Sequence, residues 1–275
     1  MSLVIDAKVV QNKQIIPGHY RITLATPYCT EKARPGQFLH VRCGSTQDPL
    51  LRRPISIHAV DPQAGEVSLL YRVAGRGTAL LAEYRVGDMV SIFGPLGRGF
   101  TLPKGDGKVC VVSGGIGIAP LYFLLQKLAG LGIFATVFQG VATAKQILIE
   151  DEIRELGHSV VVATDDGTKG FHGTVTSLFE DFLRGGGLVS KPGINEDGLV
   201  SCIFTCGPPA MMKRLSEIAA QQGAYCEVSL EERMGCGVGA CLSCACKIKD
   251  GSGWFHYRRA CVEGPVFPAG EVFWE

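Results

Sequence analysis

The sequence has little charge, and it has no apolar run long enough to suggest a membrane span. Charged residues make up 19% of its 275 residues, and the formal net charge is +1. A chain this close to neutral has no general attraction to nucleic acid or to acidic membranes. The most apolar stretch, 109–141, is broken by glycines and by Pro120, Gln126 and Lys127, which favours a strand–helix–strand core. We therefore expect no nucleic-acid partner and no membrane partner.

We expect neither a leader peptide nor a catalytic acid–base pair. The first residues lack the basic and long apolar regions of a signal peptide. With eleven cysteines and no such leader, we expect a reducing, cytoplasmic setting. The six histidines are scattered, so each is expected to be structural or at the surface. The chemistry would then belong to bound cofactors, which the protein positions.

Cysteine, by contrast, is abundant, and four of the eleven form a pattern. Cys236, Cys241 and Cys244 are spaced C-x4-C-x2-C, and Cys261 follows seventeen positions later. This is the plant-type ligand pattern of a [2Fe–2S] cluster. Glycines let such a loop adopt positive φ and bring backbone N–H groups close to the cluster sulfides; here they are Gly235, Gly237 and Gly239.

Zinc and disulfides are the alternatives for these thiols. A zinc site usually has two C-x2-4-C pairs, whereas this chain has one C-x2-C pair and a lone distant cysteine. Disulfides would form poorly among four cysteines packed into residues 236–246. Both alternatives stay open at this point. Cys246 lies on an expected strand, Ala245–Lys249, which would form a hairpin with Trp254–Arg258, and it is interpreted as a small buried residue.

The first hundred residues have the pattern of a small β-barrel. Short apolar and β-branched runs alternate with turn signals, and one helix is expected at Thr78–Tyr84. Strands this close together favour a closed antiparallel barrel. The expected strands are Leu3–Gln11, Gln14–Ala25, Gln37–Cys43, Pro54–Val60, Glu66–Val73 and Met89–Gly94.

Two places in this region could hold phosphate. The guanidinium of Arg53 could bind a diphosphate with two hydrogen bonds, and the Ser56 hydroxyl on the same strand could reach a flavin ring atom. Gly77 and Thr78 open the expected helix, and a helix N-terminus attracts phosphate. Taken singly, these are also the features of a solvated edge strand and of an ordinary N-cap.

The order of these motifs resembles the FAD-binding barrel of the ferredoxin–NADP⁺ reductase superfamily. The resemblance rests on Arg53-Pro54-Ile55-Ser56, then Tyr71-Arg72, Gly77-Thr78 and Gly94-Pro95-Leu96-Gly97. It implies that Ser56 lies near the flavin N5, as a residue of the catalytic site. It also implies that FAD is bound by Arg53, Pro54, Ile55, Ser56, Leu70, Tyr71, Arg72, Gly77 and Thr78.

After about residue 100 the pattern changes to alternating strands and helices, which predicts a parallel sheet. A strand at Val109–Ser113 leads through glycines to Pro120 and a helix ending near Leu131; such a turn brings N–H groups to a pyrophosphate. The stretch Gly185–Gly198 is predicted to be a surface loop. The other expected elements are strands at Phe134–Gly140, Ser159–Thr164 and Ile203–Cys206 and helices at Asp151–Leu156, Val175–Leu183 and Ala210–Gln222.

Two glycine-containing turns are similar to the NAD(P)-binding motifs of the same superfamily. The G-G-x-G-x-x-P and C-G-P-P motifs imply a nicotinamide dinucleotide held by Gly114, Gly115, Gly117, Pro120, Cys206, Gly207 and Pro208. Cys206 would lie close to the reactive carbon of the nicotinamide; the alternative is a buried thiol at a strand end. Because only Lys145 is near the place where a 2′-phosphate would be held, NAD is favoured over NADP.

The whole chain, divided as 1–100, 101–222 and 223–275, resembles the electron-transfer subunits of NAD-linked (class 1B) dihydroorotate dehydrogenases. The stretches Glu231–Lys247 and Gly264–Phe267 are similar to that family's. The resemblance implies an FMN-containing catalytic partner that oxidises dihydroorotate, in a heterotetramer of two subunits of each kind. Electrons would pass through the [2Fe–2S] cluster and FAD to NAD⁺, in pyrimidine biosynthesis. The Cys244–Cys261 spacing is long for the family, and the loop 185–198 looks inserted.

Two other functions are weighed. The first is another flavin and iron–sulfur reductase subunit, of the ferredoxin:NADP⁺ oxidoreductase or sulfide dehydrogenase type; such relatives can replace one cluster cysteine with aspartate, whereas this chain has four cysteines. The second is a non-enzymatic redox sensor, which would not need the FAD motifs found here.

Overall fold

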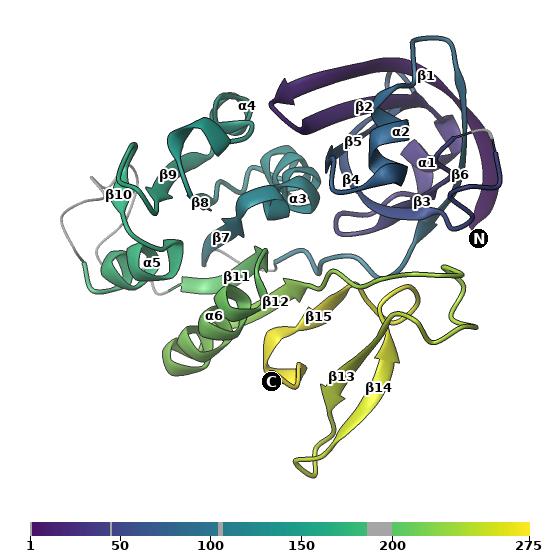
Figure 1. Ribbon diagram of the computed structural model, residues 1–275. Coiled ribbons are helices and arrows are strands. Elements are labelled where there is room, and N and C mark those ends of the chain that lie inside the picture. Colours follow the sequence, from purple (N-terminus) through teal and green to yellow (C-terminus); the bar gives the residue numbers. More distant parts are fainter. Residues whose placement is uncertain (1, 45, 104–106, 186–199) are drawn as a thin grey trace. The chain divides into compact units, whose positions relative to one another are not determined.

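The computed structural model describes residues 2–44, 46–103, 107–185 and 200–275 (Figure 1). The chain forms two compact units. Unit 1 contains the residues up to Phe100 together with Leu230–Val266, and unit 2 contains Thr101–Ser229 and Phe267–Glu275. The division into three domains stays a prediction. The predicted surface loop at 185–198 lies, apart from Gly185, outside the described residues.

Unit 1 is built on a closed antiparallel barrel with strand order β1-β2-β5-β4-β3-β6, as predicted. Alternate residues of each strand fill its interior, among them Leu39, Val41 and Ile57. The same unit contains two short helices, α1 (Pro27–Lys32) and α2 (Arg76–Ala82). The strands are β1 (Leu3–Ile16), β2 (His19–Ala25), β3 (Phe38–Val41), β4 (Arg53–Asp61), β5 (Glu66–Arg72) and β6 (Met89–Leu96).

Two local features of the barrel differ from the prediction: the strand expected from Gln14 does not begin there, and one short helix was not expected. The first break in the chain comes at Pro17-Gly18, where Ile16 pairs with His19 and Gly18 has φ +74°, so β1 continues through residues 11–14. The turn chemistry of Pro and Gly outweighs the polar residues before it. Helix α1 was not predicted: it is six residues long, starts at a proline and buries only Cys29, so it carries almost no helical periodicity.

Unit 2 contains the predicted parallel sheet, with strand order β10-β9-β8-β7-β11-β12-β15 and parallel pairing from β10 to β12. Helices α3 and α4 lie on one face, and α5 and α6 on the other (Figure 1). The chain runs outward from β7 through β8 and β9 to β10 and then returns to the other side of β7. The strands are β7 (Lys108–Gly114), β8 (Thr136–Val141), β9 (Ser159–Thr164), β10 (Phe171–His172), β11 (Val200–Cys206), β12 (Tyr225–Ser229) and β15 (Val266–Pro268). The helices are α3 (Ile118–Gly130), α4 (Glu150–Glu155), α5 (Val175–Leu183) and α6 (Pro209–Gln222), with short 3-10 turns at Gly115–Gly117, Ala144–Gln146 and Ala269–Glu271.

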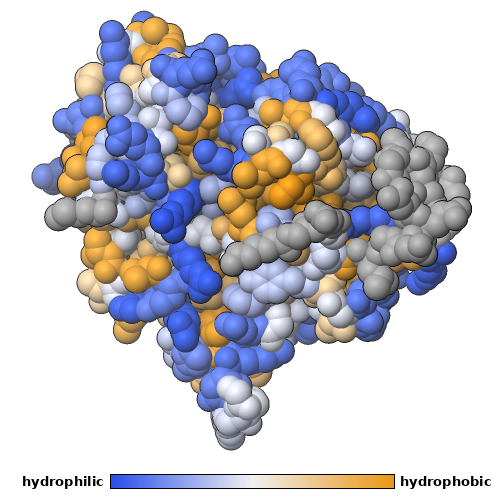
Figure 2. Space-filling model, turned by 180° about the vertical axis from the view of Figure 1, so that it is seen from behind, coloured by the Kyte–Doolittle hydropathy of each residue, from blue (hydrophilic) through white to orange (hydrophobic). Residues whose placement is uncertain are grey.

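The cysteine-rich segment of unit 1 carries the predicted hairpin, β13 (Ala245–Lys249) with β14 (Phe255–Arg259). None of the helices in the described ranges has the length and apolar character needed to span a bilayer. On the face drawn in Figure 2, hydrophobic and hydrophilic residues are interspersed.

Candidate functional site

The four predicted ligand cysteines lie together as two pairs of thiols. The thiols of Cys236 and Cys241 are hydrogen-bond partners, and so are those of Cys244 and Cys261. Within the described ranges, no three Cys, His, Asp or Glu side chains converge as one metal ion would require. Two pairs of thiols fit a two-iron cluster with two thiolates for each iron. All eleven cysteines are free of disulfides.

The two pairs differ in their electrostatic surroundings. The backbone N–H of Val238 donates to the Cys236 sulfur at 3.4 Å, and that of Ala240 donates at 3.3 Å. The Val238 N–H is the main reason why the pKa of the Cys236 thiol is lowered to about 6, which favours the thiolate that binds metal. Burial raises the pKa of Cys261, with its neighbour Cys244 adding to the effect. Cys261 would therefore need a metal to hold it as a thiolate.

The shape of the cysteine loop depends on glycines without room for a side chain. Gly237 has φ +70°, and a Cβ there would lie 2.9 Å from Nδ1 of His40. Gly239 has φ +78°, and a Cβ there would lie 2.8 Å from a methyl carbon of Val262. The guanidinium of Arg259 holds the same turn, because it donates to the Gly239 carbonyl at 3.0 Å and also pairs with Glu263. The loop is thus fixed from both sides.

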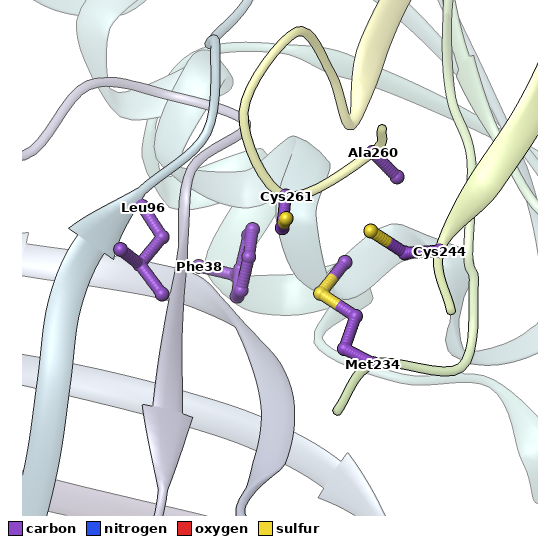
Figure 3. Close-up of a cluster of buried hydrophobic side chains, with 6 residues drawn as sticks. All are labelled: Phe38, Leu96, Met234, Cys244, Ala260 and Cys261. Atoms are coloured by element: carbon purple, nitrogen blue, oxygen red, sulfur yellow. The ribbon is translucent and has the colours of Figure 1, made fainter. Parts of the chain in front are cut away.

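The Cys244–Cys261 pair is seated on the barrel. Both cysteines are buried against Phe38 of β3 and Leu96 of β6, together with Met234 and Ala260 (Figure 3). Cys241, of the other pair, is exposed. A cluster on these four ligands would therefore have one side against the barrel and one side toward solvent.

The same outer face of the barrel carries part of the predicted flavin site. Phe38 pairs with Ser56, and His40 pairs with Pro54, across β3 and β4. Since successive residues of a strand point to opposite faces, these side chains share the face turned away from the buried Leu39. The ligand thiols and the residue predicted to lie near the flavin N5 are therefore neighbours in one unit.

The predicted diphosphate residues also come together. A Cβ on Gly77 would lie 2.7 Å from Nε of Arg53, so this guanidinium rests directly on the start of α2. The Thr78 hydroxyl accepts hydrogen bonds from the N–H groups of Ala74 and Gly75, at 2.9 and 3.2 Å. Thr78 therefore shapes the turn with its side chain, and the turn with Arg53 fits an anionic group.

The remaining predicted flavin residues divide between the two faces of the barrel wall. Ile55 and Tyr71 are buried, and Tyr71 stacks on Tyr20 with ring centroids 6.1 Å apart. Facing inward, these two can meet a cofactor on the outer face only through their backbone. Leu70 and Arg72 alternate with Tyr71 and so face outward, and Arg72 is exposed.

One residue that sequence reasoning did not assign to the site is His40. The residue is 1% exposed, and neither ring nitrogen has a hydrogen-bond partner of good geometry among the described residues, although the nearby Arg52 backbone opposes part of the fall in its pKa. Burial, followed by the charge of Arg52, lowers the pKa of His40 to about 4, so the ring is neutral at pH 7. Its only signal in the sequence is the two-residue spacing from Phe38.

In unit 2, the two predicted dinucleotide turns interlock. They follow neighbouring strands, β7 and β11, which pair through Ser113 and Cys206. A Cβ on Gly117 would lie 2.1 Å from the Cys206 carbonyl oxygen, and one on Gly207 would lie 2.8 Å from the Gly114 nitrogen. This is the point where the strand order reverses, and ligands of open α/β sheets bind there.

The predicted dinucleotide residues thus lie at one edge of the sheet. A Cβ on Gly114 would meet Pro208 at 2.5 Å, so these turns leave backbone close enough to receive a pyrophosphate. Gly115 and Pro120 begin the 3-10 turn and α3. Cys206 itself is 0% exposed, and its predicted contact with nicotinamide stays a prediction.

Three domain families match successive parts of the chain. Residues 6–100 match an oxidoreductase FAD-binding domain, and residues 111–217 match an oxidoreductase NAD-binding domain. Residues 231–273 match the iron–sulfur cluster binding domain of dihydroorotate dehydrogenase B. The cofactors expected from the sequence, FAD, NAD and an iron–sulfur cluster, are confirmed by these matches.

Curated relatives match over almost the whole chain. A protein of Desulforamulus reducens named dihydroorotate dehydrogenase B (NAD(+)), electron transfer subunit, is 47% identical over 275 residues, which is 100% of both chains. Proteins of the same name from Shouchella clausii and Geobacillus thermodenitrificans are each 40% identical, over 96% of both chains.

Solved structures agree on the fold. The structure of an NADH-dependent reduced ferredoxin-NADP oxidoreductase superposes with a TM-score of 0.81 at 28% identity, covering 98% of this chain and 90% of that one. A ferredoxin NADP⁺ reductase from Neisseria gonorrhoeae, solved with FAD and NADP, gives 0.65 at 18% identity, covering 81% and 92%. The second likeness shows the fold alone.

Proposed function

Because the chain belongs to the family of the electron transfer subunits of dihydroorotate dehydrogenase B (NAD⁺), we propose that it passes electrons from a dihydroorotate dehydrogenase catalytic subunit to NAD⁺ in pyrimidine biosynthesis. The partner carries FMN, and two subunits of each kind form a heterotetramer. When bound, the cluster supplies one-electron transfer, FAD exchanges one or two electrons, and NAD⁺ takes up a hydride. The complex works in the cytoplasm.

The observation that carries this proposal is the shared face of the barrel. Cys244 and Cys261 pack on Phe38, and Phe38 pairs directly with Ser56. Two ligands of the one-electron carrier therefore pack on the pair of strands that holds the residue assigned to the flavin N5. Short fixed separations are what electron transfer between two carriers requires of a protein, and here a single pair of strands supplies them.

Each residue then has a limited task. Arg53, with the backbone at Gly77 and Thr78, holds the FAD diphosphate, and Ser56 donates or accepts a hydrogen bond at the flavin edge. In unit 2, the turns from Gly114 and from Cys206 hold the dinucleotide and orient its nicotinamide. The protein supplies binding and orientation, and these residues need not move protons to a substrate.

The partner docks on the solvent side of the cysteine segment. Large apolar side chains are exposed around the ligand loop and on its hairpin: Val238, Leu242, Trp254, Tyr257 and Val262. Exposed apolar residues gathered on a short segment are typical of an interaction surface. The exposed Cys241 is on this side, so the partner would cover the more accessible part of the cluster site.

A second function is favoured by one observation, the TM-score of 0.81 with the NADH-dependent reduced ferredoxin-NADP oxidoreductase. The same fold could receive electrons from reduced ferredoxin instead of from a dihydroorotate-oxidising subunit. The two functions differ in the electron donor, which the same assay can vary.

The test is reconstitution of the complex. The iron- and flavin-loaded chain is mixed with a dihydroorotate dehydrogenase catalytic subunit, and NADH formation from dihydroorotate and NAD⁺ is followed. We expect NADH only when both subunits are present. Turnover with reduced ferredoxin and none with the catalytic subunit would replace the proposal by the second function.

Matched variants separate the two halves of the path. Cys261→Ser should nearly abolish dihydroorotate-driven NADH formation, while NADH still reduces the bound flavin. Cys246→Ser is the control, because this buried thiol donates to the Arg258 carbonyl at 3.2 Å and is no predicted ligand. Full transfer through an iron-free Cys261→Ser complex would contradict the path.

A further inference from the structure

The buried histidine of strand β3, His40, differs from the buried His158 of unit 2. In unit 2, Nδ1 of His158 accepts from the Ala135 N–H, and its Nε2 bonds the Leu125 carbonyl, both at 3.0 Å. His40 is equally buried, yet neither of its ring nitrogens has a partner of good geometry among the described residues, and the Arg52 backbone nearby makes only a weak contact with the ring. Buried polar groups are nearly always hydrogen-bonded, so an orphaned ring requires an explanation.

The orphaned ring lies against the cysteine loop. Its Nδ1 is 2.9 Å from the place of a Cβ at Gly237, the residue that follows Cys236. A side chain at position 237 would collide with the imidazole, so the loop is shaped to approach it. On β3, the same face presents Phe38, which contacts Cys244 and Cys261. His40 and Phe38 thus form one strip under the ligand thiols.

On the side of the predicted flavin site, the His40 ring has no polar side chain opposite it. Its partner across β4 is Pro54, which has no polar side chain, whereas Ser56 lies opposite Phe38. The atom that faces the cysteine loop is a ring nitrogen. A neutral imidazole has one N–H to donate, and thiolate and sulfide sulfurs are the acceptors that an iron–sulfur cluster brings to such a place.

We propose that His40 donates a hydrogen bond to a sulfur of the cluster held by Cys236, Cys241, Cys244 and Cys261, and that this bond raises the reduction potential of the cluster. The inference rests on the proposed ligand set. Its physical basis is that reduction adds negative charge to the sulfurs, so a donor stabilises the reduced cluster more than the oxidised one. His40 would then adjust the energy of one carrier without touching the flavin.

The experiment is a redox titration of the loaded protein, with the cluster followed by EPR and the flavin by absorbance. His40→Phe fills the space without a donor. We expect the equilibrium between reduced and oxidised cluster to shift tenfold toward the oxidised form, which lowers the reduction potential by about 59 mV for a one-electron couple. His40→Asn keeps an N–H near the position of Nδ1 and should recover most of the shift. His19→Phe is the control, since the His19 ring is hydrogen-bonded to the nearby Pro17 carbonyl and belongs to a different strand, β2.

The outcomes are distinct. A lower cluster potential with an unchanged flavin supports the inference. A shift of the flavin alone, or no shift in His40→Phe, overturns it. A wild-type protein that holds no cluster would instead remove the proposed function.

A second measurement decides the matter if His40→Phe fails to hold a cluster. Pulsed EPR of the reduced wild-type cluster with ¹⁵N-labelled histidine should show coupling to a histidine nitrogen, and this coupling should vanish in His40→Asn. Its absence from the wild type, or its survival in His40→Asn, would overturn the inference.

Discussion

The sheet of unit 2 and the cysteine segment of unit 1 differ in what completes them. In unit 2, the turn at Gly117 is pressed onto the carbonyl of Cys206, and the buried His158 has both nitrogens bonded by the protein. In the cysteine segment, a two-stranded hairpin carries two thiol pairs, and the neighbouring His40 has no partner among the described residues. A two-stranded hairpin alone is marginally stable in water.

The difference teaches which site is shaped by the protein and which depends on its cofactor. The dinucleotide turns are held by packing between neighbouring strands, so their form does not need the ligand. The cysteine loop has protein contacts on one side, to Phe38 and His40, and free thiols on the other. Metal binding then contributes directly to the folding free energy of the segment, as it does in small metal-bound domains.

Metal removal should give the largest separation between the two regions. After chelation of the iron, amides of β13 and β14 should lose most of their protection from hydrogen exchange, because the pairs Cys236–Cys241 and Cys244–Cys261 no longer share a cluster. Amides of β7 and β11 should keep theirs. Mass spectrometry of exchange in the loaded and iron-free protein measures both regions at once. Equal loss of amide protection in the two regions would contradict the expected difference between them.

A side chain in the dinucleotide turn should produce the next largest effect, now confined to unit 2. Gly117→Ala places a Cβ 2.1 Å from the Cys206 carbonyl oxygen, so the turns must separate. We expect a loss of about 1–3 kcal/mol in the free energy of unfolding and weaker NADH binding, measured by fluorescence titration. The cluster spectrum should not change.

Gly130→Ala is the matched control for this substitution. Gly130 ends α3 and has no neighbour within 4 Å of an added Cβ, so it should bind NADH as the wild type does. Normal NADH binding by Gly117→Ala would mean that the two turns do not form the dinucleotide site.

The smallest expected effect is a pH dependence of stability, and it concerns His158, whose two ring nitrogens are both hydrogen-bonded. Burial lowers the pKa of His158, so below about pH 6.5 the unfolded chain takes up a proton that the folded chain does not. The stability of unit 2 should therefore fall as the pH drops from about 6.5 toward the lowered pKa. His158→Phe should remove this part of the pH dependence and cost about 1–3 kcal/mol, because the Ala135 N–H and the Leu125 carbonyl lose their partner.

Denaturant unfolding at several pH values, followed by a unit 2 probe, measures this effect. His40→Phe serves as the contrast, since it removes no hydrogen bond to a described residue. An equal loss of unfolding free energy for the two substitutions in the iron-free protein would show that His40 has a protein partner. The two regions would then differ less in how their buried histidines are hydrogen-bonded.

The sequence predicted those parts of the molecule that depend on neighbouring residues. The spacing of Cys236, Cys241 and Cys244 and the glycine turn before Pro120 are local patterns, and the barrel and the parallel sheet follow from strand and helix periodicity. Helix α1 was missed because six residues with one buried side chain carry no periodicity. The individual cofactor contacts stay predictions.

Sequence by itself therefore determined the chemistry of this protein: which side chains can hold iron, and which turns can approach a phosphate. Only the tertiary structure decided which of them are neighbours. Strand pairing puts Phe38 and His40 on one face with Ser56, and it puts Gly117 against Cys206. Each of these contacts joins residues of different elements, and it depends on strand register or on closure of the barrel, which no local pattern encodes.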